Sequence, residues 1–176
     1  MDVKTMVTAA LLCAVGIIIP MYSPIRILLE PASFTLASHV AIFIAMFISP
    51  LIAAIVSLGT TLGFFLGGFP IVIVARAATQ IVFAVIGALI LTKKPSILDA
   101  LWPSLALSLL LGVIHGLGEV LAVTPFYLNS AMSAAYYGGG YIKTVVGLVG
   151  LGTIVHSMVD FAIAQLVWRP LKKTLK

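Results

Sequence analysis

The stretch FPIVIVARAATQIVFAVIGALIL, residues 69–91, decides the fold class. Apart from Arg76 and Gln80 it holds almost only apolar and small residues, over a length that exceeds the ~18–20 residues a helix needs to cross a bilayer. The rest of the 176-residue chain is similar, because 62% of it is hydrophobic and only 9% is charged. A typical soluble domain has about 25% charged residues. We therefore expect an all-α integral membrane protein with a single transmembrane domain over residues 1–176.

Proline and glycine divide the apolar sequence into six segments, each of which predicts a membrane helix. Pro50, Gly67, Pro95 and Pro125 lie at four of the breaks. The second and third segments are short, so we expect them to be tilted or shielded by protein. The sequence thus predicts a six-transmembrane-helix bundle, with helices over approximately residues 4–21, 34–48, 51–66, 71–92, 101–123 and 145–168.

Basic residues collect at those segment ends that share one side of the membrane. With six spans both termini lie on that side, and the positive-inside rule assigns it to the cytoplasm. The expected outer loops are then Tyr22–Ser33, Gly67–Pro70 and Thr124–Thr144. The net charge of +5 is a topology signal and does not indicate nucleic-acid binding. The basic residues on the expected cytoplasmic side are Lys4, Lys93, Lys94, Arg169, Lys172, Lys173 and Lys176, whereas the outer loops hold Arg26 and Lys143.

A few polar side chains lie inside the apolar segments, where a charge near the bilayer centre costs ~2.5–3.5 kcal/mol. Arg76 is expected about 9 Å below the outer end of its helix, at ~1.5 Å per residue. We expect its side chain to face the bundle interior, beside a pocket that opens outward. His156 and Asp160 are expected near the middle of the membrane or below it. The expected outer polar layer consists of Arg76, His39, His115 and Glu119.

Arg76 has two interpretations. A guanidinium binds a carboxylate through paired hydrogen bonds, so a small organic acid is a natural ligand for a buried arginine. The alternative is an ion pair with Glu119 that only holds two helices together. A pair that opens to admit a ligand satisfies both interpretations.

The segments VIHGLGEV and IVHSMVDF share a His-x-x-x-acid spacing, which places His115 with Glu119 and His156 with Asp160 on one helix face. The two pairs together could bind a metal ion or serve an intramembrane hydrolase, although local hydrogen bonding between helices is the simpler interpretation.

The chain has no adjacent acidic pair, and so it lacks the Glu-Glu-x-x-x-Arg motif of CAAX-protease-like enzymes. It also has no Gly-x-x-x-x-Gly-Lys-Ser/Thr phosphate loop. We expect no metal site, no cofactor and no enzymatic activity; a channel or a secondary transporter is a further alternative.

The first segment contains Ala10-x-x-x-Ala14, a spacing of small residues that lets two membrane helices approach closely. Together with the chain length, six expected helices and cytoplasmic termini, it resembles the substrate-binding S-components of energy-coupling factor (ECF) vitamin transporters. The resemblance covers the whole chain and implies a multi-pass protein of a bacterial plasma membrane. It also implies that Ala10 and Ala14 dock on the transmembrane coupling protein of a module that adds two ATPases.

Two stretches, PASFTLASHVAIFIAMFISP and LGTTLGFFLGGFPIVIVARA, are most similar to the niacin-type members of that family. The resemblance implies a vitamin pocket near the outer surface, under the loop after the first helix, with walls from the last three helices. Nicotinate would offer a carboxylate to Arg76; pantothenate, another carboxylate vitamin, is the alternative. The resemblance places the substrate-binding residues at Arg76, His39, His115, Glu119, Asn129 and Tyr136, with Phe34 and Tyr137 as lid or stacking residues.

Overall fold

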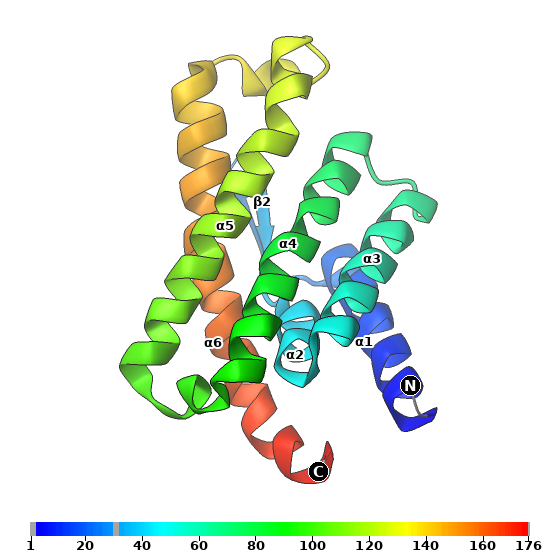
Figure 1. Cartoon of the computed structure of the whole chain (residues 1–176). Helices are drawn as coiled ribbons and strands as arrows, with labels where there is room; N and C mark the ends of the chain where they lie inside the picture. Colours follow the sequence, from blue (N-terminus) through cyan, green and yellow to red (C-terminus); the bar gives the residue numbers. More distant parts are fainter. Residues whose placement is uncertain (1–2, 30–31, 176) are drawn as a thin grey trace.

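Each apolar run forms a helix in the computed structural model, which describes residues 3–29 and 32–175 (Figure 1). A β-hairpin follows the first helix, and short helical turns occupy two of the later loops. In chain order the elements are α1 (Val3–Tyr22), β1 (Arg26–Leu29), β2 (Ala32–Thr35), α2 (Val40–Ile48), α3 (Pro50–Leu66), α4 (Ile71–Lys93), η1 (Pro95–Asp99), α5 (Leu101–Leu128), η2 (Ala134–Tyr136), η3 (Ile142–Leu151) and α6 (Gly152–Leu175).

Among the described residues, four helical stretches are long and apolar enough to cross a membrane, namely α1, α4, α5 and the continuous stretch Ile142–Lys172 that joins η3 to α6. Helix α3 is apolar but has 17 residues, and α2 has only 9. The chain is therefore a multi-pass integral membrane protein, as its composition predicts.

The expected helix over residues 34–48 begins only at Val40, so the prediction is wrong for its first part. Phe34 and Thr35 instead end strand β2, which pairs antiparallel with β1. Ala37 then has a φ of 67°, a left-handed conformation that costs a non-glycine residue roughly 1–2 kcal/mol and interrupts a right-handed helix. The hairpin fills the expected outer loop Tyr22–Ser33 and extends beyond it.

Three other helix boundaries also differ from the prediction. Helix α6, predicted to end at residue 168, continues to Leu175 with Pro170 inside it. Helix α5 was expected to end at residue 123 but continues to Leu128, with Pro125 inside its last turns. The Thr124 hydroxyl donates to the Val120 carbonyl at 2.6 Å within that segment. The last helical stretch begins at Ile142 rather than at residue 145, because its first ten residues form a π-helix. The outer loop between α5 and η3 is correspondingly shorter than Thr124–Thr144.

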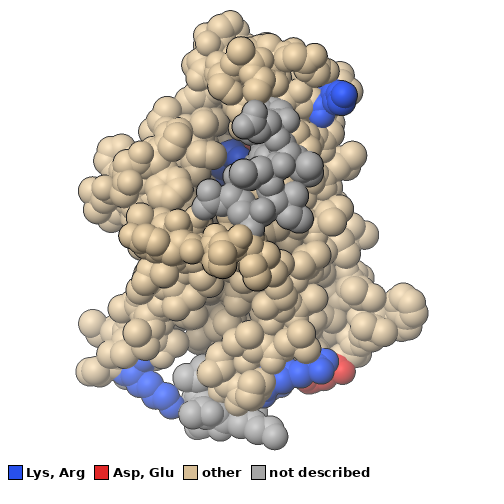
Figure 2. All heavy atoms as spheres, turned by 180° about the vertical axis from the view of Figure 1, so that it is seen from behind, with Lys and Arg blue, Asp and Glu red and all other residues tan. Residues whose placement is uncertain are grey.

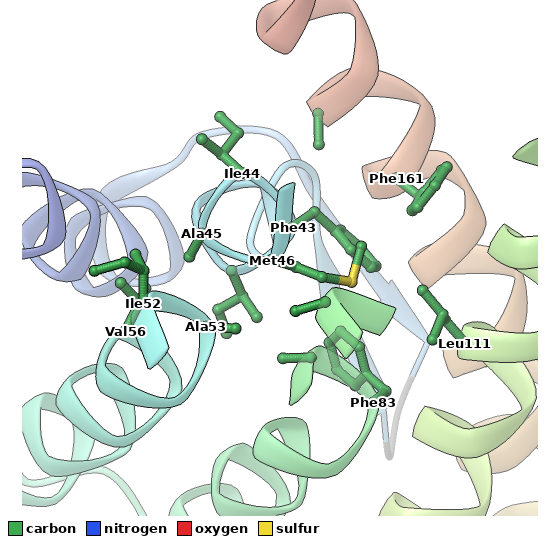
Figure 3. Packing of buried hydrophobic residues seen from close by; sticks show 14 of the residues in the cluster. Phe43, Ile44, Ala45, Met46, Ile52, Ala53, Val56, Phe83, Leu111 and Phe161 are labelled. Atoms are coloured by element: carbon green, nitrogen blue, oxygen red, sulfur yellow. The ribbon is translucent and has the colours of Figure 1, made fainter. Parts of the chain in front are cut away.

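The main apolar core surrounds the short helix α2 (Figure 3). Seven of its nine residues are buried. Phe43 packs against Phe83 of α4 and Phe161 of α6, with ring centroids 5.3 and 5.2 Å apart. Because most of α2 is buried, it acts as the hub to which α3, α4 and α6 attach.

Both chain ends lie at the same end of the bundle (Figure 1). The view from behind shows Lys and Arg side chains gathered at that end (Figure 2). The loop that joins α5 to η3 lies at the opposite end.

The contact of α5 with the last helical stretch depends on Gly116. A Cβ atom at this position would lie 2.8 Å from the Gly150 carbonyl oxygen and 3.0 Å from Ile154 Cγ1. Gly116→Ala should therefore lower the free energy of unfolding by about 1–3 kcal/mol through overpacking, measured by thermal unfolding in detergent. Gly147→Ala is the matched control, because its Cβ would meet only the Ile142 carbonyl oxygen, at 3.4 Å. Equal stability of the two variants would contradict this account of the helix contact.

Candidate functional site

A cavity of about 180 Å³ lies between the hairpin and helices α3 to α6. At about 30 Å³ per liquid water molecule, it has room for about six waters, which is the scale of one substituted ring. Figure 2 shows a basic group inside a recess in the half of the molecule that lies away from the termini. The described residues that line the cavity are Pro20, Phe34, Thr35, Ser38, His39, Thr60, Phe64, Phe69, Ile73, Arg76, Ala77, Gln80, Glu119, Thr153 and His156.

Arg76 and Glu119 form a buried ion pair on the wall of this cavity. Arg76 Nε and Nη2 both donate to Glu119 Oε2, at 3.1 and 2.7 Å. Thr153 adds a third hydrogen bond to the same oxygen, at 2.6 Å. Within the described part of the chain, Arg76 Nη1 has no hydrogen-bond partner. The guanidinium is therefore held by Glu119 along one edge and retains N–H donors for a ligand.

Glu119 Oε1 faces a second partner, His115. The distance from His115 Nε2 is 3.5 Å, without hydrogen-bond geometry, and that nitrogen is buried with no other partner among the described residues. His115 Nδ1 lies 3.3 Å from Ser157 Oγ. His115 is fully buried behind the cavity wall, where it supports Glu119 and packs 4.7 Å from the His39 ring.

Two further polar side chains line the cavity with unused hydrogen-bonding atoms. Thr60 Oγ1 and Gln80 Oε1 are buried and have no hydrogen-bond partner in the described structure. A buried polar group without a partner costs about 1–3 kcal/mol, so such groups in a cavity wall indicate a polar ligand or bound water.

The hairpin covers one side of the cavity through Phe34. Its ring lies over Gly152, where an added Cβ would come within 2.6 Å of Phe34 Cζ. The Phe34 ring also packs 5.5 Å from the His156 ring. The absence of a side chain at Gly152 thus lets the Phe34 ring pack directly against the backbone of α6.

Asp160 joins α6 to the turn before α2. Its Oδ1 accepts from the Ala37 N–H at 2.7 Å, and its Oδ2 accepts from the His39 N–H at 2.9 Å and from His39 Nδ1 at 3.0 Å. His156 Nε2 lies 3.4 Å from the same Oδ2. The expectation that His156 and Asp160 lie deeper than His39 is therefore wrong, because the turn before α2 descends to meet them. His39, His156 and Asp160 also place three potential metal-ligand atoms within 4.8 Å of one another.

Comparison with curated proteins finds a relative that extends over most of the chain. It is the niacin transporter NiaX of Lactococcus lactis subsp. cremoris (strain MG1363), 39% identical over 162 residues that cover 92% of this chain and 72% of the relative. The chain belongs to the NiaX family. The resemblance to niacin-type S-components is thereby confirmed, and the chain is a transport subunit rather than an enzyme. No family model and no solved structure matches.

The cavity brings together four of the residues that the sequence proposes for the NiaX-family site, namely Arg76, Glu119, His39 and Phe34. Tyr136 lies in η2 and is half-buried near the ion pair. Burial raises the pKa of its phenol; the Arg76 charge opposes that rise and the Glu119 charge adds to it. Tyr136 and three other proposed residues are not among those that line the cavity. His115 lies behind the wall, Asn129 is exposed at the end of α5, and the Tyr137 hydroxyl accepts from the Met132 N–H at 3.2 Å.

Sequence reasoning did not propose Thr60, Gln80, Ser38, Thr153 or His156 as binding residues. Gln80 was visible as a polar residue one helical turn after Arg76, which is the spacing of two residues on one face. Ser38, Thr60 and Thr153 gave no such signal, because hydroxyl residues are frequent in membrane helices and often bond only to their own backbone.

Asp160→Ala should destabilise the fold strongly, because it leaves the Ala37 and His39 N–H groups without their acceptor. We expect a loss of about 2–4 kcal/mol in the free energy of unfolding, seen as a lower midpoint of thermal unfolding in detergent. Asp99→Ala is the matched control: Asp99 has a side chain that is 67% exposed and meets Lys172 at 3.5 Å, so its loss should cost at most about 0.5 kcal/mol. A similar midpoint for both variants would argue against Asp160 as the anchor of α2.

Proposed function

We propose that this protein is the niacin-binding S-component of an ECF-type vitamin importer. One observation carries the proposal: a guanidinium with unused donors lies on the wall of a partly open cavity of about 180 Å³. The similarity to the niacin transporter NiaX supports the same substrate. Pantothenate is disfavoured, because the relative that the chain resembles over 92% of its length is a niacin transporter.

Nicotinate fits the chemistry of the cavity wall. Its carboxylate would accept from Arg76 Nη1, and its flat ring would contact Phe34 and the stacked pair Phe64 and Phe69, whose centroids are 4.6 Å apart. The ring nitrogen needs one donor, which the Thr60 hydroxyl on the same wall can supply.

The hairpin acts in this proposal as the cover of the site. Phe34 is 9% exposed and lines the cavity from the hairpin side. Niacin would enter when this hairpin and the loop that carries Tyr136 move apart, and their closure would exclude water from the charged carboxylate.

The termini are proposed to face the cytoplasm, with six crossings of the membrane. The gathering of basic side chains at the end that carries both termini supports this orientation (Figure 2). The second crossing would be shared by β2 and the short α2. Non-helical backbone at that depth is tolerable only where protein surrounds it, and Asp160 satisfies its N–H groups.

Helix α1 is the proposed docking surface for the transmembrane coupling protein. Only 11% of the residues in the apolar part of α1 are buried within the bundle. Ala10 and Ala14 are both exposed on this helix. Small residues four positions apart permit a close helix crossing. Two partner ATPases would supply the energy that releases the vitamin, since the chain contains no phosphate loop.

Arg76→Ala should weaken nicotinate binding by at least about tenfold, or ~1.4 kcal/mol, because the carboxylate loses its charged donor. Isothermal titration of the detergent-purified protein measures this. Arg76→Ala alone leaves the buried Glu119 carboxylate without its cation. The double variant Arg76→Ala/Glu119→Gln removes both charges and therefore tests the contribution of Arg76 to nicotinate binding without an unpaired charge. Arg169→Ala, at the cytoplasmic end of α6, is the control that should keep full affinity. Unchanged affinity in the folded double variant would refute the role of Arg76.

The pair Ala10→Trp and Ala14→Trp should leave nicotinate binding intact and abolish ATP-driven uptake in proteoliposomes, because two indoles prevent close docking of α1. Leu117→Trp with Leu121→Trp repeats the same spacing on the exposed face of α5, where the two leucines are 59% and 72% exposed. This control should support normal uptake. If the α1 variant still transports, the docking surface lies elsewhere.

A further inference from the structure

Four side-chain atoms next to the cavity form a compact group, in which five of the six edges are between 3.0 and 3.4 Å. Ser38 Oγ lies 3.0 Å from His156 Nε2, 3.3 Å from His39 Nδ1 and 3.4 Å from Asp160 Oδ2. Asp160 Oδ2 lies 3.0 Å from His39 Nδ1 and 3.4 Å from His156 Nε2. The remaining edge, between the two imidazole nitrogens, is no longer than 4.8 Å.

The five short edges have the length found in a tetrahedral zinc site. Zinc binds histidine nitrogen and carboxylate oxygen at roughly 2.0–2.2 Å, so the ligand atoms of a tetrahedral site lie about 3.3 Å apart. Five edges of the observed group are between 3.0 and 3.4 Å. These five separations are compatible with a cation bound among the four atoms.

The donor set is also of the zinc type. Two imidazoles and one carboxylate, with an exchangeable fourth position, are typical of zinc sites that bind an external ligand. Magnesium and calcium prefer sets of oxygen ligands and are disfavoured here. The carboxylate of Asp160 is already oriented, because its Oδ1 accepts from the Ala37 N–H at 2.7 Å. Oriented outer contacts of this kind accompany most protein metal ligands.

Charge provides an independent argument. The charges of Arg76 and Glu119 cancel in their ion pair, and Asp160 leaves one further negative charge beside the cavity when the imidazoles are neutral. A carboxylate vitamin that enters this site would place a second negative charge in a medium of low dielectric constant. A divalent cation bound to Asp160 reverses the sign of this region and attracts a monoanion.

We propose that Ser38, His39, His156 and Asp160 bind a zinc-class divalent cation next to the cavity. Ser38, His39 and His156 line the cavity, so the weak Ser38 hydroxyl is the ligand that a substrate can replace. That second step rests on the proposed function: the ring nitrogen of nicotinate takes the position of Ser38 on the cation instead of accepting from Thr60, while the carboxylate stays on Arg76. No covalent bond of the vitamin changes.

The test uses full-length protein purified in detergent without a polyhistidine tag and stripped of metal with a chelator. Titration with Zn²⁺ should show one ion per chain, and saturation with Zn²⁺ should raise nicotinate affinity by about tenfold or more. His156→Gln should reduce Zn²⁺ affinity by about tenfold or more, whereas Ser38→Ala should retain most of it. Asp99→Asn, remote from the cavity, is the control with unchanged Zn²⁺ and nicotinate affinity.

Each outcome decides a separate point. Absence of Zn²⁺ binding to the stripped wild type, or equal Zn²⁺ affinity in folded His156→Gln, would overturn the metal site. Nicotinate binding that is the same with and without Zn²⁺ would overturn the role of the cation as a ligand anchor and leave the niacin proposal intact. Tight Zn²⁺ binding without nicotinate binding under either condition would support the metal site and overturn the proposed function instead. Thermal unfolding of His156→Gln verifies that the variant is folded.

Discussion

The carboxylate of Asp160 is the contact on which the site depends. Helix α2 begins inside the membrane-embedded bundle, where water cannot satisfy its first N–H groups. Asp160 accepts from the N–H groups of Ala37 and His39 and so ties α6 to the start of α2. This tie places the His39 ring at the cavity and supports the aromatic core around Phe43 below it. A single side chain thereby connects the apolar core with the polar wall above it.

The ion pair of Arg76 and Glu119 adds a second constraint, on charge. Burial of either group alone would be prohibitively unfavourable, whereas the pair is neutral and its hydrogen bonds to Glu119 Oε2 are short. The guanidinium is engaged along one edge only. The same residue can therefore link α4 to α5 and still present donors to the cavity. The two interpretations of Arg76 are therefore compatible. The Nε and Nη2 edge of the guanidinium binds Glu119, and Nη1 is the donor left for a ligand.

Irregular backbone surrounds the cavity, and this explains why the space exists. Ala37 has a positive φ, a hairpin replaces the first turns of the expected second helix, and a π-helix leads into α6. Regular helices packed side by side would fill the volume with their own side chains. Glycines allow the closest approaches: Gly152 accepts the Phe34 ring, and Gly116 permits contact between α5 and the Gly150 carbonyl. Departures from ideal geometry often concentrate at functional sites in this way.

The sequence by itself determined the class of the protein, most helix boundaries to within a few residues, and the burial of a charged side chain at Arg76. It could do so because the length of an apolar run and the cost of a charge in lipid are local properties. Only the tertiary structure decided that His39, His156 and Asp160 meet at one depth, or that Thr60 and Gln80 face the same cavity as Arg76. His39 and Asp160 are separated by 121 positions, and their contact arises from a turn whose backbone conformation no periodicity predicts. Local pattern fixes which segments enter the membrane, whereas long-range hydrogen bonds fix which polar atoms share a cavity.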